Sequence, residues 1–240
     1  MKHRLRAGVV VPIFQHSGDK ALDVATRAEA AGVDGVFCYD HIWPMGQPER
    51  PALAPFPVLG VVATSSARLA LGTLVARVGL VPDHVLLAEY AALEALAPGR
   101  VIAGLGTGDR LSAGENEAYG VEFTEPAERR ASLRACARAL LSRGVAVWVG
   151  DGARATRRIA YEEGAALNVW DVPAPRVAEE AGRCEVTWAG PVPDGALAPF
   201  VADLADAGAS WVVFSWPVDL AELVAAVAAA GGRGGTRVRL

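Results

Sequence analysis

Short apolar segments alternate with longer, helix-like segments eight times along this chain. The short segments are rich in Val and nearly continuous in hydrophobicity, as expected for parallel strands buried on both faces. The predicted strands cover residues 7–12, 34–38, 69–75, 100–105, 145–149, 165–169, 184–189 and 210–215. Eight such units in 240 residues predict one (β/α)8 barrel domain over residues 1–240, because barrels of this kind typically have about 250 residues.

Helix signals lie between the predicted strands. Residues 19–32 end at a glycine, a common residue just past a helix end, and Pro126 suits the first turn of a helix over 126–142. Further helices are predicted at 55–66, 83–97, 195–207 and 218–230, and the glycine-rich stretch 231–237 is predicted to be a C-terminal tail. We expect eight helices around a closed barrel.

Composition narrows the class of protein. No uninterrupted apolar run approaches the roughly 20 residues of a membrane helix, and the basic, then apolar N-terminus is better explained as the first strand than as a signal peptide. Three widely spaced cysteines, Cys38, Cys136 and Cys184, indicate a reduced, cytoplasmic protein with no metal site or disulfide framework. The net charge of −4 does not favour nucleic-acid binding, so a small-molecule substrate is expected.

The two longest predicted connections, 39–54 and 106–125, both follow strands. Barrel enzymes place their active sites on loops at the C-terminal ends of the strands. His41 follows the second strand beside Asp40, and an imidazole can transfer protons near neutral pH. His41 is therefore a candidate catalytic residue, although it could also serve only to stabilise the loop.

Two glycine-rich turns are further candidates. Gly104, Gly106 and Gly108 precede Asp109 after the fourth strand, where exposed amides could bind a phosphate or a flavin-like ring edge. Residues 150–153 open a helix whose free N–H groups could bind a phosphate. The alternatives are an ordinary turn at the first site and an N-cap formed by Asp151 at the second. Several tryptophans near strand ends could wall a planar cofactor or simply pack: Trp43, Trp148, Trp170, Trp188 and Trp216.

Five segments in order resemble the luciferase-like monooxygenase superfamily, particularly its deazaflavin-dependent branch. They are AEAAGVDGVFCYDH (28–41), ARLALGTLV (67–75), LLAEYAALEALAPGRVIAGLGTG (86–108), ERR (128–130) and VWVGDGARATRRIAYEEGAALNVW (147–170). The resemblance implies a barrel that uses coenzyme F420 or flavin mononucleotide (FMN) for hydride transfer. It also implies a non-prolyl cis peptide within residues 73–75, backing the cofactor ring.

The resemblance assigns roles to individual residues. His41 takes the part of the proton-transfer histidine, and Asp109 takes that of the acidic residue after the fourth strand. The implied cofactor-binding residues are Trp43, Thr73, Leu74, Val75, Gly106, Thr107, Gly108, Gly150, Asp151, Gly152 and Ala153.

The chain also departs from the family pattern. Only Arg143-Gly144 joins the fourth helix to the fifth strand, where relatives have a long insertion, and we expect a more open mouth as a result. The turns after the fifth strand and within the sixth differ, and Thr107 replaces a luciferase-type arginine. Three functions stay open: an F420-dependent oxidoreductase, an FMN-dependent monooxygenase, or a non-catalytic barrel that binds a small molecule or a partner subunit. The apolar helices at 55–66 and 83–97 predict a homodimer contact.

Overall fold

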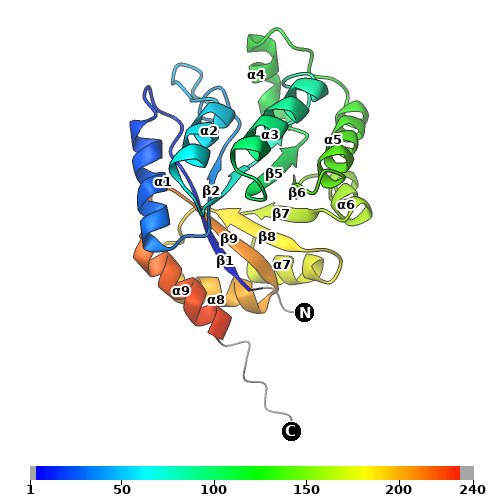
Figure 1. Cartoon of the computed structure of the whole chain (residues 1–240). Coiled ribbons are helices and arrows are strands. Elements are labelled where there is room, and N and C mark those ends of the chain that lie inside the picture. Colours follow the sequence, from blue (N-terminus) through cyan, green and yellow to red (C-terminus); the bar gives the residue numbers. More distant parts are fainter. Residues whose placement is uncertain (1–3, 233–240) are drawn as a thin grey trace.

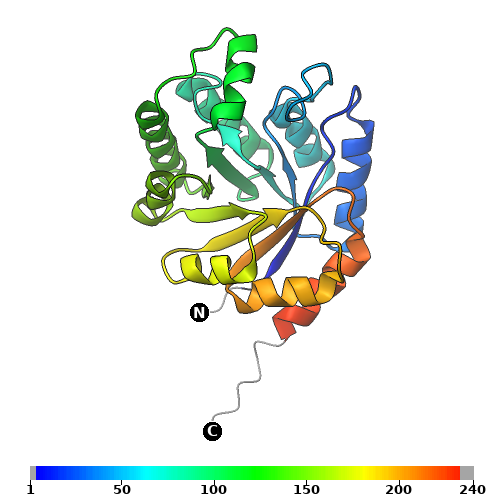
Figure 2. The ribbon, with the colours of Figure 1, turned by 180° about the vertical axis from the view of Figure 1, so that it is seen from behind.

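Parallel strands form a closed barrel in the computed structural model, which describes residues 4–232 (Figures 1 and 2). The strands are β1 Arg6–Val10, β2 Gly35–Cys38, β3 Ala70–Thr73, β4 Ala76–Arg77, β5 Val101–Gly106, β6 Ala146–Gly150, β7 Ala166–Trp170, β8 Val186–Gly190 and β9 Ala209–Ser215. Their order is β3-β2-β1-β9-β8-β7-β6-β5-β4, and pairing of β3 with β5 closes the ring. Since β3 and β4 share one position in the ring, the predicted eight-stranded barrel is confirmed.

Helices surround this barrel on the outside (Figure 1). They are α1 Asp19–Ala31, α2 Pro55–Ser65, α3 Asp83–Leu96, α5 Pro126–Leu141, α6 Arg154–Glu163, α7 Ala174–Ala181, α8 Leu197–Asp206 and α9 Leu220–Gly232. A 3-10 turn, η1 (Arg110–Ser112), and a short helix, α4 (Ala113–Ala118), lie in the connection after β5. The sequence did not predict these two elements. Helix α9 includes the first two residues of the predicted tail, and residues 233–237 of that tail lie outside the described residues.

The third barrel strand differs from its prediction. A continuous strand over 69–75 is wrong, because β3 ends at Thr73 and β4 begins at Ala76. The peptide between Leu74 and Val75 is cis, as the resemblance implied. The Thr73 hydroxyl donates to the carbonyl of Gly104 at 2.7 Å and lies 2.6 Å from the hydroxyl of Tyr90. A buried side-chain bond to β5 therefore replaces regular strand pairing where β3 ends.

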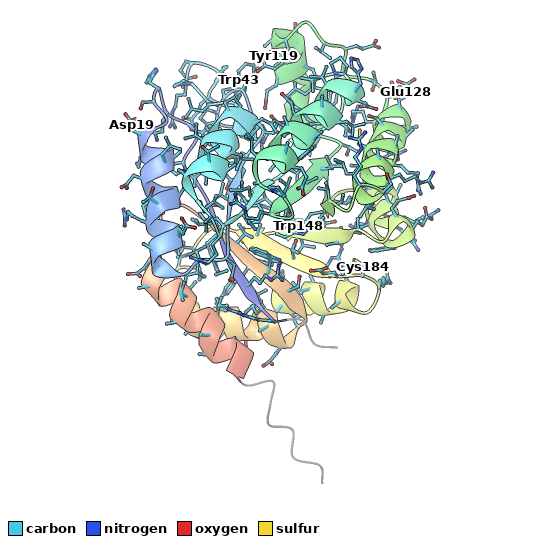
Figure 3. All side chains as sticks on the ribbon, viewed as in Figure 1. Asp19, Trp43, Tyr119, Glu128, Trp148 and Cys184 are labelled. Carbon is cyan, nitrogen blue, oxygen red and sulfur yellow. The ribbon has the colours of Figure 1, made fainter. Side chains whose placement is uncertain are left out.

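Three aromatic rings fill the inside of the barrel. Phe37 stacks on Trp148 with ring centroids 5.0 Å apart, and Trp211 meets both rings edge-on at 5.7 and 5.5 Å. Figure 3 labels Trp148 near the middle of the molecule. Glycines on neighbouring strands provide room, because a Cβ at Gly72 would lie 2.7 Å from the ring of Phe37. Trp148 is therefore a packing residue and not a cofactor wall.

We predict that Gly72→Ala lowers the free energy of unfolding by about 1–3 kcal/mol, the usual cost of overpacking a filled core. The added methyl group would press on the Phe37 ring and on the carbonyl oxygen of Ile102, 2.9 Å from the ideal Cβ position. Urea unfolding of both proteins measures the effect. Gly195→Ala is the control, because an added Cβ at that position meets no atom within 4 Å. Equal stability of the two variants would contradict this account of the interior.

The connection between α5 and β6 is short, as predicted, since α5 ends at Leu141 and β6 begins at Ala146. It enters β6 at the N-terminal end of the strand, whereas the mouth lies at the C-terminal ends. The short connection therefore lies at the other end of the barrel from the mouth, and its length gives no reason to expect a more open mouth. Within residues 4–232, no helix combines the length and hydrophobicity needed to cross a membrane.

Candidate active site

A cavity of about 840 Å³ opens at the C-terminal ends of the strands. Most of the predicted site residues line it together: His41, Leu74, Val75, Gly106, Thr107, Gly108, Asp109, Gly150, Asp151, Gly152 and Ala153. Thr73 lies beneath it, fully buried. Residues that are more than a hundred positions apart in sequence meet here because every strand ends at the same rim.

His41 is held by a carboxylate that sequence reasoning missed. Its Nδ1 lies 2.8 Å from Oε1 of Glu115, and the amide N–H of Ile42 donates to the other oxygen of Glu115 at 3.0 Å. A carboxylate can only accept here, so Nδ1 carries the proton and Nε2 of the neutral ring keeps its lone pair. The His41 side chain is 27% exposed whereas that of Glu115 is 2% exposed. The imidazole therefore reaches the cavity from a buried anchor.

Arg77 joins this anchor to Asp40, the residue that precedes His41 in the sequence. Its guanidinium lies 3.3 Å from Oε2 of Glu115, and its backbone N–H donates to Asp40 at 2.9 Å. Asp40 thus binds β4 instead of orienting the neighbouring His41. Arg77 is 4% exposed, and its Nε has no hydrogen-bond partner in the part of the chain that is described.

The two carboxyl groups beside Arg77 differ in their protonation behaviour. Burial raises the pKa of Asp40, although the backbone N–H and the charge of Arg77 oppose it. Burial also acts upward on the pKa of Glu115, but the hydrogen bonds from His41 and Ile42 outweigh it, so that this pKa is lowered. Glu115 is therefore the group that keeps a negative charge beside His41.

Asp109 lies on the rim of the cavity, where it caps η1. Its carboxylate accepts the backbone N–H of Leu111 at 2.9 Å and that of Ser112 at 3.2 Å. The structure thus shows a local structural function for Asp109 and no contact with His41, while a catalytic function stays a prediction. Asp109→Asn separates the two, because Asn caps helices as well as Asp does but cannot exchange a proton.

The aromatic wall of the cavity differs from the predicted one. Trp43 does not line the cavity, and its ring lies beside Gly114 of α4; Figure 3 labels it at the same end of the molecule as Tyr119. Tyr39 and Trp170 line the cavity instead, with ring centroids 5.9 Å apart. Tyr39 also stacks on Phe14 at 5.9 Å. Trp43 therefore does not form a wall of this cavity, and its contact with the cofactor stays a prediction.

The glycines at the ends of β5 and β6 form a surface around Val75. A Cβ at Gly106 would lie 2.5 Å from Val75, and one at Gly150 would lie 3.2 Å from it. Gly108 has a φ of +64°, and a Cβ there would lie 2.6 Å from Arg77. These glycines therefore leave room for the side chains of Val75 and Arg77, which line the cavity.

The turn after β6 leads into α6, whose N-terminus faces the cavity. The N-cap position is Ala153, and no side chain caps the helix. The alternative in which Asp151 caps α6 is therefore wrong. Asp151 instead lies 3.2 Å from Arg157 and 4.0 Å from Arg176, so its charge is compensated from the outside of the barrel. The first N–H groups of α6 stay available to an anion.

Two arginines of α5 add positive charge to this rim. Arg129 and Arg130 line the cavity, and Nε of Arg129 donates to the carbonyl of Thr107 at 2.8 Å. The guanidinium of Arg129 also lies 3.8 Å from the ring centroid of Phe123. Two residues of the ERR segment noted in the sequence therefore line the cavity. The sequence alone did not indicate which groups they contact.

Comparison with known proteins identifies the family. The family profile for luciferase-like monooxygenases matches residues 5–240. The chain belongs to the luciferase-like monooxygenase family. The curated relatives include an F420-dependent glucose-6-phosphate dehydrogenase from Beutenbergia cavernae, 34% identical over 196 residues that make up 80% of this chain and 55% of that protein. A protein of the same name from Kineococcus radiotolerans is 36% identical over 135 residues, 56% of this chain and 39% of the relative.

A solved structure shares the fold. An F420-dependent secondary alcohol dehydrogenase in complex with an F420–acetone adduct superimposes with a TM-score of 0.66, at 18% identity over 95% of this chain and 82% of the other. The chain spans about half the length of the curated relatives it matches.

Proposed function

We propose that this protein is an F420-dependent oxidoreductase that transfers hydride between the coenzyme and a small alcohol or carbonyl compound at the barrel mouth. One observation carries the proposal: His41 lines the cavity while the buried Glu115 holds its Nδ1 at 2.8 Å, which leaves Nε2 without that partner. Hydride transfer from an alcohol carbon needs a base for the hydroxyl proton, and a histidine anchored in this way is suited to accept it. The F420-dependent relatives support the choice of cofactor.

The residues of the cavity fit a planar cofactor that carries a phosphate. When bound, the coenzyme would supply the hydride acceptor, while the protein provides orientation and proton transfer. Leu74 and Val75 line the cavity and would lie against the ring, and the glycines at the ends of β5 and β6 leave room for the side chain of Val75. The turn at residues 150–153, at the free N-terminus of α6, would hold the phosphate.

His41 and Glu115 would then work as a unit in both directions. During oxidation of an alcohol, Nε2 takes the hydroxyl proton, and the carboxylate of Glu115 stabilises the resulting imidazolium. During reduction of a carbonyl compound, the same imidazolium returns the proton to oxygen. Thr107 and Asp109, which follow β5 and line the same cavity, remain candidates for contacts with cofactor or substrate.

Titration of the purified protein with F420 and, separately, with FMN tests the choice of cofactor by fluorescence and visible absorption. The proposal expects saturable binding of F420 and its reduction by an alcohol from a panel that includes sugar phosphates. Saturation by FMN together with oxygen-dependent turnover would support a monooxygenase. Binding of neither cofactor would leave the non-catalytic barrel, which the departures after β6 and within β7 favour.

We also propose a homodimer formed through α2 and α3. Val61 and Leu96 on these helices are 48% and 51% exposed, and exposed apolar side chains on adjoining helices favour association. We predict that the double variant Val61→Glu/Leu96→Glu sediments as a monomer at micromolar concentration while the parent sediments as a dimer. Val192→Glu, at a 38% exposed valine after β8, is the matched control. A monomeric parent protein would contradict the proposal.

A further inference from the structure

A smaller hollow lies beside the active-site cavity, at the C-terminal ends of β1 and β9. This side pocket measures about 350 Å³. Phe14 and Tyr39 line both the side pocket and the cavity, and their rings stack with centroids 5.9 Å apart. The two spaces therefore share one aromatic wall. At roughly 30 Å³ per heavy atom, the volume that one water takes in the liquid, the side pocket holds about twelve heavy atoms.

The side pocket lies across the barrel mouth from the proposed cofactor contacts. Around the ring, the strands follow one another from β1 and β2 through the shared position of β3 and β4 to β5, β6, β7, β8 and β9. In this ring of eight, β1 lies opposite β6 and β9 lies opposite β5. Val10 ends β1, Ser215 ends β9, and both line the side pocket. A substrate that reacts between the coenzyme and His41 would therefore extend its remaining atoms toward the side pocket.

The inner surface of the side pocket is mainly apolar. Ile13 and Trp216 line it together with the ring of Tyr39, and Gln15 contributes one amide. The hydroxyl of Tyr39 lies 2.7 Å from that of Ser215. Burial raises the pKa of Tyr39, so its hydroxyl stays neutral and already has a partner. Hydrocarbon gains free energy by entering such a space, whereas most hydroxyl groups of a sugar would lose their water without finding a partner.

Positive charge gathers at the exposed edge of the side pocket. Lys20 and Arg50 line it and are exposed, and no carboxylate belongs to its lining within residues 4–232. In the same range neither cation forms an ion pair, and Arg50 donates to the amide oxygen of Gln47 at 2.9 Å. The backbone N–H of Leu53 donates to the carbonyl of Ile13 at 2.9 Å. This bond ties the loop that carries Arg50 to the loop that precedes Lys20.

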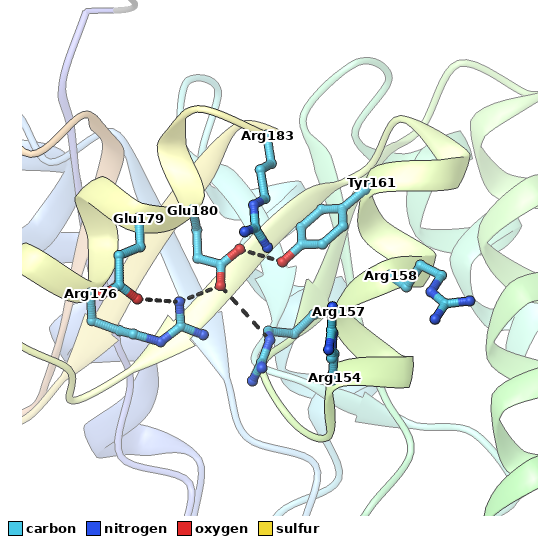
Figure 4. A pocket seen from close by; sticks show the side chains of 8 residues that line it. All are labelled: Arg154, Arg157, Arg158, Tyr161, Arg176, Glu179, Glu180 and Arg183. Atoms are coloured by element: carbon cyan, nitrogen blue, oxygen red, sulfur yellow. Dashed lines mark hydrogen bonds and ion pairs between the residues drawn. The ribbon is translucent and has the colours of Figure 1, made fainter.

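The larger hollow between α6 and α7, of about 640 Å³, is separate from this arrangement. Figure 4 shows the arginines that line it around Tyr161 and Glu180. Within residues 4–232 it shares no lining residue with the cavity or with the side pocket. Glu180, which is buried, pairs there with Arg157 and Arg176. The cations that bear on the choice of a substrate at His41 are therefore those of the side pocket.

We propose that the side pocket selects alcohols, or the corresponding carbonyl compounds, whose hydrocarbon body ends in a carboxylate. This inference rests on the proposed function and names the substrate class of that site. The reacting carbon lies beside His41, the hydrocarbon lies against Phe14 and Tyr39, and the carboxylate meets Lys20 and Arg50. The carbinol carbon gives its hydride to the coenzyme and the hydroxyl proton goes to Nε2 of His41, so that a carbon–oxygen double bond forms. The carboxylate is unchanged.

Steady-state oxidation with F420 at low ionic strength tests the proposal. The substrates are acids that carry a hydroxyl group at the end remote from the carboxylate, in increasing chain length, and the neutral alcohols of the same lengths. The acids should have the higher kcat/KM, with a maximum for chains that fill the side pocket. Glucose 6-phosphate, a hydrophilic anion, should be a poorer substrate than the best acid. The advantage of the acids should disappear near 1 M salt, where the screening length is about 3 Å.

Two variants test the cations. Lys20→Gln/Arg50→Gln should lower the ratio of kcat/KM for an acid to that for its neutral alcohol by roughly 3- to 10-fold, the effect of two exposed ion pairs. Lys20→Glu/Arg50→Glu should turn the preference toward amino alcohols, whose ammonium group replaces the carboxylate. The control is Arg143→Gln/Arg183→Gln, which removes two exposed arginines that line neither the side pocket nor the cavity.

The outcomes separate this inference from the proposed function. Equal kcat/KM for acids and neutral alcohols, equal ratios in the side-pocket and control variants, or a preference for glucose 6-phosphate would each overturn the inference while F420-dependent turnover remains. If no alcohol is oxidised, the proposed function fails, and calorimetric titration with octanoate then tests the side pocket alone. Weaker binding of octanoate to Lys20→Gln/Arg50→Gln than to the control variant would support a site for apolar carboxylates. Equal binding or no binding would refute it.

Discussion

His41→Ala is expected to lower turnover with F420 by about 10²–10⁴-fold, the usual contribution of one general acid–base group. The variant keeps the cavity, but the alcohol proton then has no acceptor anchored at the mouth. Affinity for the coenzyme should change much less, because the proposed ring and phosphate contacts come from Leu74 and Val75, from the ends of β5 and β6 and from the start of α6. Single-turnover reduction of F420 with a saturating alcohol measures the effect.

A purely structural function of His41 predicts a different pattern. Loss of the bond to Glu115 would then lower the melting temperature, and activity would fall only in proportion to the folded fraction. Measuring rate, coenzyme affinity and melting temperature on one preparation separates the two. A folded His41→Ala protein with full activity would remove His41 from the mechanism. His84→Ala is a suitable control, because that histidine lies in the first turn of α3, away from the cavity lining.

The barrel could be predicted from the sequence because its determinants are local and repeated. Each strand needs only a short apolar run, and each helix carries its own start and stop signals, so eight repetitions constrain the topology. The strand break at Thr73 could not be predicted from hydrophobicity, since residues 69–75 are apolar apart from Thr73 and resemble one strand. At the break the Thr73 hydroxyl donates to the carbonyl of Gly104, which lies 31 residues further on and could not be identified from the local sequence.

The sequence predicted where the candidate site lies, but it did not predict most of the contacts within it. Strand ends converge in any barrel, so His41 and the glycine turns could be placed together. The partner of His41 could not be predicted, because Glu115 lies 74 residues away in a helix of six residues. The sequence indicated Asp109 instead, because this acidic residue directly follows the glycines. In the structure Asp109 caps η1, and Glu115, six residues later, is the carboxylate that contacts the imidazole of His41.

Glu115→Ala is expected to lower the free energy of unfolding at pH 7 by about 3–5 kcal/mol, the range for removing one partner of a buried ion pair. Arg77 is 4% exposed and would keep its positive charge. Within residues 4–232, the remaining hydrogen-bond partner of its guanidinium would be the backbone carbonyl of Ser112, at 3.3 Å. Urea unfolding measures the loss. Glu115→Gln keeps an acceptor for Ile42 and should cost less. A change below about 1 kcal/mol in Glu115→Ala would contradict the ion-pair account.

The pH dependence distinguishes charge from packing at Glu115. Its pKa in the folded protein is lowered from an ordinary 4.5, so its ionised form stabilises the fold fully above that pH. This contribution is lost as the pH falls through the lowered value. The stability difference between the parent and Glu115→Gln should therefore be constant at neutral pH and should narrow below about pH 4.5.

If Glu115 also positions His41 for catalysis, turnover should fall in Glu115→Gln. Nitrogen NMR should then show that the ring proton of His41 is no longer fixed on Nδ1. An unchanged tautomer with normal turnover would leave Glu115 as a purely structural residue.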